Sequence, residues 1–349
     1  MNNLTFDFNN LVRENVRSLT PYSSARDEYV SDGSKMIFLD ANENPFDNGV
    51  NRYPDPQQRS LKAVLVQQKE VLLNQILLGN GSDEVLDLLF RAFCEPKVDN
   101  IITLPPTYGM YKVLANINNV EERQVFLDHT FEPDVSKILE STDGNTKIIF
   151  LCSPNNPTGN SFSEDRIVTI LENFKGLVVI DEAYIDFSDK ESWIKRLDEF
   201  PNLIITQTLS KAYGLAGIRL GLCYASKEII EILNRIKPPY NVNELTQKRA
   251  LTRVLNNDQV TKEVSDILLE RNLLAAVLKD IPFVLKVYPS DANFILVKVD
   301  NADLRYRELL EKGIVIRNRG TQPLCENTLR FTIGTKEENK VLIETLKKL

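Results

Sequence analysis

Histidine is almost absent from this chain of 349 residues, which contains only His129. Zinc sites with histidine ligands and nucleophile systems of the Ser-His-Asp or Cys-His type need histidines at set places. A single histidine therefore excludes most of this chemistry, and we expect no metal site. If the chain is an enzyme, other residues do most of its acid–base work.

Cysteine, basic charge and long apolar runs are also scarce. The four cysteines, Cys94, Cys152, Cys223 and Cys325, form no CxxC pair, which favours reduced thiols in the cytoplasm over zinc or a disulfide framework. We expect no signal peptide and no membrane span, because no run approaches the ~20 apolar residues that cross a bilayer. The net charge of −7 argues against nucleic acid as a partner.

What remains is the composition of a globular protein, with 42% hydrophobic and 26% charged residues. Apolar runs rich in Val, Ile and Leu alternate with helical patterns, which is typical of strands covered on both faces of a sheet. This order predicts an α/β fold with a doubly wound, mostly parallel sheet. The expected strands are 76–78, 101–104, 148–152, 177–180 and 203–206.

The pattern changes after Pro238-Pro239, where a smaller α+β domain is expected to begin. There we expect a long helix over 244–279, strands at 283–288, 293–299 and 314–317, and a helix near 304–312. The predicted organisation is an N-terminal arm over 1–30 that packs with the small domain, a large domain over 31–240 and a small domain over 241–349.

Polar residues follow the expected strands, at the edge where open α/β sheets bind ligands. Gly79-Asn80-Gly81-Ser82-Asp83 can bind a phosphate at a helix start or form a capped turn. Asp181 can bind magnesium, pair with a buried cation or end its strand in a turn. Lys211, just past a buried strand, can lose hydration and become a Schiff-base amine, or lie in a surface loop.

In their order along the chain, these motifs resemble those of the fold-type I pyridoxal-phosphate-dependent aminotransferases. The similar strings are Gly81-Ser82-Asp83, Pro106-Thr107-Tyr108, Asn156-Pro157-Thr158-Gly159, Asp181-Glu182-Ala183-Tyr184, Ser210-Lys211 and Arg219. Within that superfamily, longer strings are similar to the histidinol-phosphate aminotransferases: Asp40-Ala41-Asn42-Glu43-Asn44-Pro45, Asn51-Arg52-Tyr53-Pro54 and Pro105-Pro106-Thr107-Tyr108-Gly109-Met110-Tyr111. The resemblance implies a pyridoxal 5′-phosphate enzyme that transaminates L-histidinol phosphate with 2-oxoglutarate in histidine biosynthesis.

The resemblance also implies roles for individual residues. Lys211 would hold the cofactor and act as the general base, and Asp181 would face the pyridine nitrogen. Tyr184 and Asn156 would donate to the phenolic oxygen, and Tyr108 would stack on the ring. The residues expected at the cofactor phosphate are Ser82, Asp83 through its backbone amide, Thr208, Ser210, Arg219 and, from the neighbouring subunit of a homodimer, Tyr53.

Substrate recognition is implied for Arg330 and Arg317, whose guanidinium groups can bind a phosphate or a carboxylate, and for Tyr22 and Asn42. One departure from the family pattern is Gln207, where an arginine or aromatic residue is common. Several alternatives stay open at this point. They are a threonine-phosphate decarboxylase or a broad aromatic aminotransferase of the same fold, a cofactor-binding regulator without turnover, and a nucleotide-binding protein.

Overall fold

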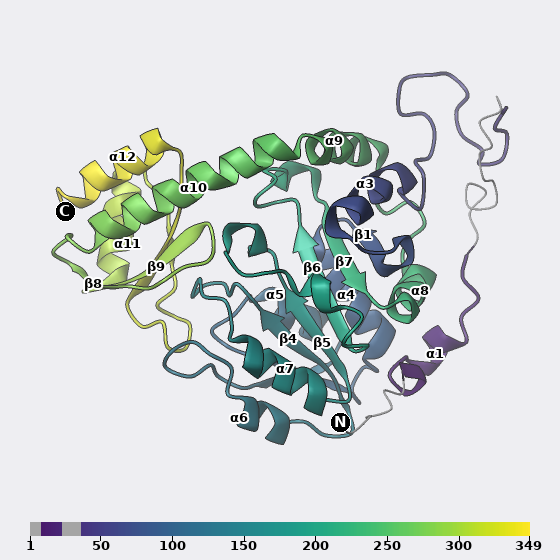
Figure 1. Cartoon of the computed structure of the whole chain (residues 1–349), viewed down its shortest axis with the longest axis horizontal. Coiled ribbons are helices and arrows are strands. Elements are labelled where there is room, and N and C mark those ends of the chain that lie inside the picture. Colours follow the sequence, from purple (N-terminus) through teal and green to yellow (C-terminus); the bar gives the residue numbers. More distant parts are fainter. Residues whose placement is uncertain (1–7, 23–35) are drawn as a thin grey trace.

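The computed structural model of the chain describes residues 8–22 and 36–349. A large domain occupies the centre and one side of the molecule, and a small domain occupies the other side (Figure 1). Helix α10 (Asn257–Leu278) runs from the large domain to the small one and connects them.

Within the described residues, the large domain contains a seven-stranded sheet in the order β1-β7-β6-β5-β4-β2-β3. Its strands are β1 (Ile76–Gly79), β2 (Asn100–Thr103), β3 (Glu121–Gln124), β4 (Thr146–Cys152), β5 (Leu177–Asp181), β6 (Leu203–Thr208) and β7 (Gly221–Ala225). Strands β2 to β6 pair in parallel, and β7 is antiparallel to β1 and β6. The predicted mostly parallel α/β sheet is confirmed. Strand β3 was not expected, because its residues are polar and lie at the sheet edge, and neither was β7.

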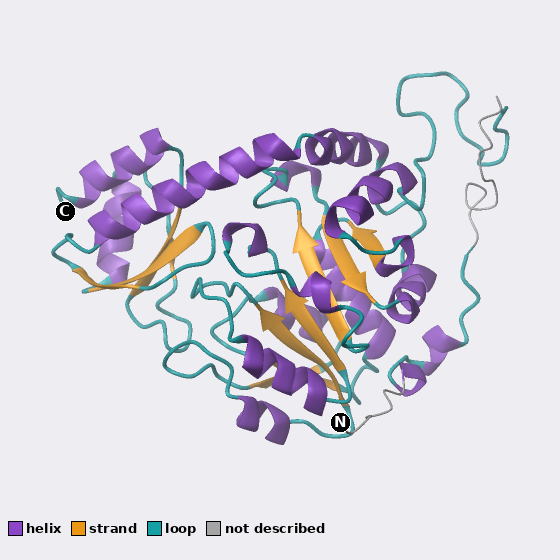
Figure 2. Cartoon of the chain, in the orientation of Figure 1, coloured by secondary structure: helices purple, strands orange, loops and turns teal. Residues whose placement is uncertain are grey.

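Both faces of this sheet are covered by helices, as Figure 2 shows. One layer contains α4 (Ser82–Phe93), α5 (Met110–Ile117) and α8 (Lys227–Ile236), and the other contains α3 (Arg59–Lys69), α6 (Val135–Glu140), α7 (Glu164–Asn173) and α9 (Glu244–Leu255). Alternate strand residues point to opposite layers: Phe150 packs with the α4 side and Leu151 with the α7 side. Burial on both faces explains why the apolar runs are uninterrupted. Short 3₁₀ helices are η2 (Leu73–Gln75), η3 (Ile185–Phe187), η4 (Trp193–Arg196) and η5 (Ala216–Ile218).

The small domain is built on an antiparallel sheet in the order β10-β11-β9-β8. Its elements are β8 (Val284–Val287), β9 (Phe294–Val299), α11 (Ala302–Glu311), β10 (Arg317–Asn318), β11 (Thr328–Thr332) and α12 (Lys336–Leu346). One face packs against α11, α12 and the end of α10 in a separate core. From the opposite face, Phe294 and Leu296 pack into the large-domain core.

The change of domain lies inside α10 rather than at 240/241. The expected helix over 244–279 is two helices, α9 and α10, which meet at Asn256. Val254 and Val260 belong to the large-domain core, whereas Leu274 and Leu278 belong to the small-domain core. The chain therefore stays on the large domain through α9 and crosses over along α10.

The described part of the N-terminal arm packs against the large domain. It contains η1 (Phe8–Asn10) and α1 (Glu14–Arg17). Val12 and Val16 join the core on the α4 side of the sheet, and Arg13 Nε lies 3.0 Å from Glu95 Oε2. The expectation that the arm packs with the small domain is wrong for these residues, and residues 1–7 and 23–30 lie outside the described part.

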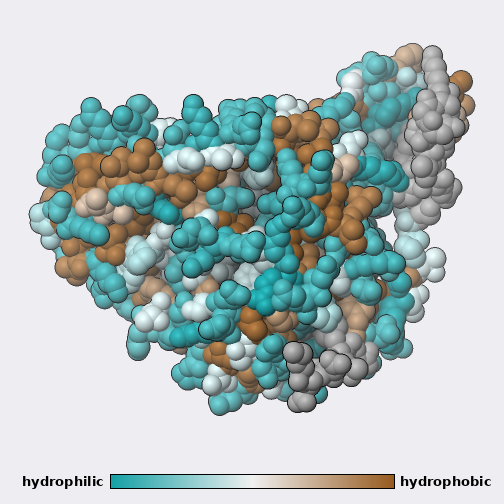
Figure 3. All heavy atoms as spheres, viewed as in Figure 1, coloured by the Kyte–Doolittle hydropathy of each residue, from teal (hydrophilic) through white to brown (hydrophobic). Residues whose placement is uncertain are grey.

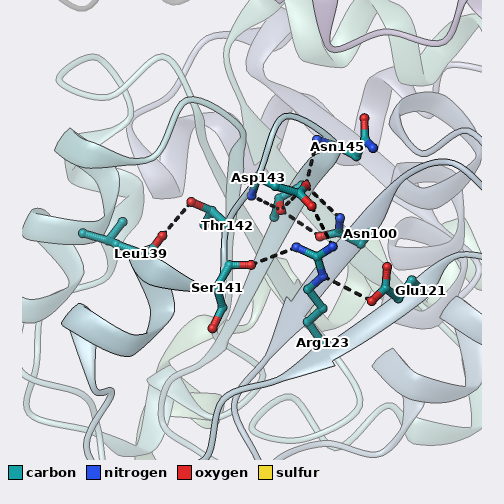
Figure 4. A network of polar contacts seen from close by, with 9 residues as sticks. Asn100, Glu121, Arg123, Leu139, Ser141, Thr142, Asp143 and Asn145 are labelled. Carbon is teal, nitrogen blue, oxygen red and sulfur yellow. Dashed lines mark hydrogen bonds and ion pairs between the residues drawn. The ribbon is translucent and has the colours of Figure 1, made fainter.

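The amino ends of β2, β3 and β4 are joined by the polar network in Figure 4. The Asp143 carboxylate accepts hydrogen bonds from Asn100 Nδ2 at 3.0 Å and from the Asn145 amide at 2.9 Å, and it pairs with Arg123 at 2.7 Å. These bonds lower the pKa of Asp143. The network holds the first residues of these strands together. It lies at the amino ends of the strands, at the opposite edge of the sheet from the predicted site.

Hydrophobic side chains reach the surface in two areas of Figure 3, over α10 with its small-domain neighbours and around α3 and α9. Leu269 and Leu273 of α10 and Leu245 and Leu255 of α9 are more than half exposed. Among the described residues, no helix has both the length and the apolar character that a membrane crossing needs.

Candidate active site

A cavity of about 160 Å³ lies at the carboxyl ends of β4, β5 and β6. Parallel strands bring these ends to a single edge of the sheet, which is why motifs far apart in sequence meet there. The sequence-predicted residues that line the cavity are Ser82, Asp83, Tyr108, Asn156, Asp181, Tyr184, Thr208, Ser210, Lys211 and Arg219. Cys152 and Ala183 also line it, and the sequence had assigned neither of them a role.

Lys211 enters the cavity from the turn that follows β6. Its Nζ lies 5.6 Å from the centre of the Tyr184 ring. Burial lowers the pKa of Lys211 below its ordinary value, and the charge of Arg330 lowers it further. The amine therefore loses its proton more readily than that of a surface lysine, which suits a nucleophile or a base.

Asp181 ends β5 and is only 3% exposed. The Tyr111 hydroxyl donates to its Oδ2 at 2.8 Å, and the Ala183 amide donates to its Oδ1 at 3.2 Å. Burial raises the pKa of Asp181. Among the described residues, no cation forms an ion pair with this carboxylate. A buried carboxylate with hydrogen-bond donors but no cation suits a ligand that brings a positively charged N–H group.

The start of α4 forms one wall of the cavity. Gly81 has φ +83°, and a Cβ there would lie 2.7 Å from Arg219 Nη2. A Cβ at Gly221 would lie 2.2 Å from the Ser82 amide nitrogen. Helix α4 has no side-chain cap. Its first amides, which are not capped by a side chain, and the nearby Arg219 guanidinium therefore suit an anion such as a phosphate.

Hydroxyl groups complete this wall. Thr208 Oγ1 donates to Ser210 Oγ at 3.0 Å, and both side chains line the cavity. The Tyr108 hydroxyl donates to Asp83 Oδ1 at 3.0 Å, and Asp83 Oδ2 lies 3.8 Å from Arg219 Nη2. The Asp83 carboxylate therefore has partners of its own, and the expectation that the Asp83 backbone amide faces the phosphate stays a prediction.

Arg330 connects the small domain to the cavity from β11. Its Nη1 donates to Asn156 Oδ1, and its guanidinium lies 4.9 Å from the centre of the Phe294 ring. Burial and the neighbouring charge of Arg319 lower the pKa of Arg330 to about 10. Since Arg330 uses the amide oxygen of Asn156, the amide NH₂ keeps its hydrogens for another acceptor. Tyr184 beside it is 6% exposed, and burial raises its pKa.

Four predicted site residues lie away from the cavity within this chain. Tyr53 and Asn42 line a separate open pocket of about 420 Å³. The Tyr53 ring also stacks on Tyr240, with ring centres 4.4 Å apart. Tyr22 is 76% exposed at the end of the described arm. Arg317 is exposed on β10, opposite Arg330 in the ladder.

The fold gives Tyr111 and Gln207 contacts near the site that the sequence had not indicated. Tyr111 of α5 supports Asp181, and its place three residues after Tyr108, in the same family-like string, is the signal that could have found it. Gln207 Nε2 donates to the buried Glu182 Oε2 at 2.9 Å. Gln207, the residue that departs from the family pattern, thus supplies a hydrogen-bond donor to the buried Glu182 carboxylate beside the site.

The match to a known family agrees with this geometry. Residues 36–346 match the family described as aminotransferase class I and II. The chain belongs to this family. Curated relatives show which enzymes of this family the chain resembles. A histidinol-phosphate aminotransferase of Flavobacterium johnsoniae is 69% identical over 99% of both chains. The enzyme of the same name from Christiangramia forsetii is 65% identical over 99% of this chain and 98% of its own.

Solved structures share the fold. The histidinol-phosphate aminotransferase of Clostridium acetobutylicum has a TM-score of 0.79 at 25% identity, covering 86% of this chain and 90% of that one. The enzyme of the same name from Sinorhizobium meliloti, in complex with pyridoxal-5′-phosphate, has a TM-score of 0.77 at 23% identity, covering 85% and 82%.

Proposed function

We infer that this chain transfers the amino group of L-histidinol phosphate to 2-oxoglutarate, giving imidazole acetol phosphate and glutamate in histidine biosynthesis. The identity of 69% over nearly the whole chain to a histidinol-phosphate aminotransferase supports this substrate pair. The observation that carries the chemistry is the cavity that a lysine of lowered pKa lines together with a buried carboxylate, which forms no ion pair with the described residues.

The cofactor is pyridoxal 5′-phosphate, whose aromatic ring withdraws the electron pair left on the substrate α-carbon. Asp181 suits its protonated ring nitrogen, because the carboxylate is buried and has no cation partner among the described residues. The α4 amides with Ser82, Thr208, Ser210 and Arg219 suit its phosphate. The space beside Gly81 and Gly221, which a Cβ would fill, lets the backbone approach that phosphate closely.

Lys211 is the residue that we propose to hold the cofactor through its amine and then to move the proton of the substrate α-carbon. Its lowered pKa makes the neutral amine, the form that can accept that proton, easier to reach than in a surface lysine. Tyr184 and the free amide NH₂ of Asn156 provide donors for the phenolic oxygen. Tyr108, fixed by its bond to Asp83, would stack on the ring face.

Arg330 would bind the anionic end of each substrate. A planar guanidinium can grip a phosphate or a carboxylate with two parallel hydrogen bonds, so a single residue can serve both. Its buried Nε has no partner among the described residues and is available for such a bond. We propose Arg317, Tyr22 and Asn42 as further groups near the substrate.

We also propose that the enzyme works as a homodimer in the cytoplasm. The pocket lined by Tyr53 contains the exposed side chains Val50 and Leu245, which a second copy would cover. In that arrangement Tyr53 would reach the cofactor phosphate of its neighbour. All four cysteines are unpaired and buried, which fits a reducing compartment.

The test compares the two phosphorylated substrates that this fold can accept. Purified enzyme with added cofactor is given histidinol phosphate and 2-oxoglutarate, and glutamate is measured. In parallel it is given threonine phosphate, and carbon dioxide is measured. We expect glutamate without carbon dioxide, and release of carbon dioxide without glutamate would assign the chain to the decarboxylases.

Replacement of the proposed base tests the mechanism. Lys211→Ala should lower turnover by about 10²–10⁴-fold or more, because both the covalent attachment and the proton transfer are lost. Lys227→Ala, on the exposed face of α8, is the matched control and should keep full activity. Full activity of Lys211→Ala would contradict the assignment.

A further inference from the structure

The turn between β1 and α4 is held by hydrogen bonds of its own backbone amides. The Gly81 amide donates to the Gly79 carbonyl at 2.9 Å, and the Asn80 amide donates to Glu84 Oε2 at 2.5 Å. Both amides of the turn therefore have partners within the chain. The amides of the first helical residues, which begin with Ser82, have no partner inside α4 and can still bind an anion.

The Glu84 carboxylate also contacts the segment that joins α8 to α9. Asn241 Nδ2 donates to Glu84 Oε2 at 2.7 Å and to the Leu78 carbonyl of β1 at 3.0 Å. One amide group thus holds both the end of the strand and the first turn of the helix that follows it. A Cβ at Gly79 would lie 3.3 Å from the same carboxylate oxygen, so the glycine leaves the room that this carboxylate occupies.

A buried lysine lies behind Asn241. Lys237 is 7% exposed, and its Nζ donates to Asn241 Oδ1 at 3.1 Å and to the Pro56 carbonyl at 3.3 Å. Because its oxygen accepts from a charged group, the amide NH₂ of Asn241 becomes a stronger donor to Glu84. The positive charge of Lys237 also offsets part of the negative charge of Glu84, which would otherwise oppose an anion at the start of α4.

The other side of the turn is packed closely against β7 and the residues before it. A Cβ at Gly81 would lie 2.7 Å from Arg219 Nη2, and a Cβ at Gly221 would lie 2.2 Å from the Ser82 amide nitrogen. Ser82 and Arg219 both line the cavity. Hydrogen bonds weaken steeply as their distance and angle change. A displaced turn would therefore misalign the α4 amides and the Arg219 guanidinium with respect to any anion that they share.

We propose that Glu84 and Asn241 are positioning residues for the phosphate group of the cofactor. The proposal rests on the proposed function, since it concerns the cofactor of that reaction. Glu84 acts through the backbone of the turn: its carboxylate holds the Asn80 amide, and Asn241 holds the carboxylate. The Ser82 amide and its neighbours in the first turn of α4 then keep the position in which they bind the phosphate. Neither positioning side chain lines the cavity itself.

The experiment compares two ligands that differ only in the phosphate, pyridoxal 5′-phosphate and pyridoxal. The full-length chain, freed of cofactor, is titrated with each ligand, and calorimetry gives the two dissociation constants. Glu84→Ala should weaken binding of pyridoxal 5′-phosphate by about 10- to 100-fold, as expected when hydrogen bonds to a charged group are lost. Binding of pyridoxal should change by less than about 3-fold, because it lacks the group that the turn binds.

Two further variants test the chain of contacts. Asn241→Ala should show the same selectivity for the phosphorylated ligand, with a loss of about 5- to 10-fold. Glu84→Gln should recover most of the loss seen in Glu84→Ala, because its amide oxygen has two lone pairs and can accept both hydrogen bonds.

Glu338→Ala is the matched control. Glu338 is likewise the third residue of its helix, α12 in the small domain, and its Oε2 accepts from the Thr335 amide at 2.8 Å. Its replacement should lower the melting temperature and leave both dissociation constants unchanged. Equal weakening of both ligands by Glu84→Ala, or an unchanged affinity for pyridoxal 5′-phosphate, would overturn the proposal. If Glu84→Ala does not fold, Asn241→Ala decides by the same comparison. A parent chain that binds no pyridoxal 5′-phosphate would contradict the proposed function instead.

Discussion

At the scale of single residues, the support of Asp181 is the feature that most affects the chemistry. A carboxylate that is 3% exposed keeps its orientation only if its oxygens have partners. Tyr111 supplies one through its hydroxyl, and its ring is fixed by stacking on Phe150 with ring centres 4.8 Å apart. Tyr111 is therefore a positioning residue that acts through Asp181.

Replacing this hydroxyl tests the role. Tyr111→Phe should lower kcat about 10-fold and reduce cofactor affinity, because a charge-assisted hydrogen bond to Asp181 is lost. Unfolding free energy should fall by about 1–3 kcal/mol, since a buried oxygen loses its donor. The measurements are steady-state kinetics, cofactor titration and thermal unfolding.

Tyr224→Phe is the matched control for this substitution. Tyr224 is equally buried, and its hydroxyl has no hydrogen-bond partner among the described residues. Removing that hydroxyl should leave activity unchanged and alter stability by less than about 0.5 kcal/mol. Similar effects of both variants would show that Tyr111 acts only through packing.

At the scale of elements, α3 contains a buried charge with an unfavourable neighbour. Lys62 is 4% exposed beside Lys237, which is also buried. Burial lowers the pKa of Lys62 to about 8, and the charge of Lys237 contributes to the shift. The folded pKa therefore lies below the unfolded value of about 10.4. Below pH 8 the amine is protonated in both states, and the folded state bears the full cost of the buried charge.

This shift predicts a stabilising substitution. Lys62→Met should raise the unfolding free energy at pH 7 by up to about 3 kcal/mol, because it removes a buried charge and keeps most of the volume. Between pH 8 and about 10.4 the unfolded state of the parent protein binds more protons than its folded state, so the unfolding free energy of the parent rises with pH. The advantage of the variant should therefore shrink over that range.

Denaturant unfolding at pH 7 and pH 10 measures this difference. Lys248→Met, on the exposed face of α9, is the control and should change stability by less than about 0.5 kcal/mol at either pH. A destabilised Lys62→Met protein at pH 7 would contradict the assignment.

At the scale of the whole molecule, Tyr53 and Asn42 raise the question of assembly. They line an open pocket outside the cavity of their own chain, beside Leu245 of α9. A second copy that covers this surface would bury Val50 and Leu245 and complete the other copy's site.

Truncation of Tyr53 tests this arrangement. Tyr53→Ala should weaken cofactor binding about 10-fold and shift sedimentation toward the monomer, because an aromatic contact and a phosphate ligand are lost together. Phe126→Ala removes an aromatic ring of similar exposure elsewhere, and it should change neither quantity. A parent protein that sediments as a fully active monomer would contradict the homodimer.

Much of the fold could be predicted because the central strands are buried on both faces. Continuous apolar runs such as 148–152 and 177–180 are typical of such strands, and the polar residues directly after them mark the ligand-binding edge. The polar edge strand β3 has no such signal. The domain change could not be placed either, because the apolar stripe of a helix does not show which domain it packs against.

The residue types at the strand ends, and the family to which the chain belongs, can be read from the amino-acid sequence alone. Lys211, Asp181 and Arg219 lie next to strands or turns whose positions local patterns indicate, so their meeting follows from the order of parallel strands. The tertiary structure decided the contacts between distant segments. The hydrogen bond from the Tyr111 hydroxyl to Asp181 and the one from Arg330 to Asn156 depend on how helices and domains pack together, which no local pattern specifies.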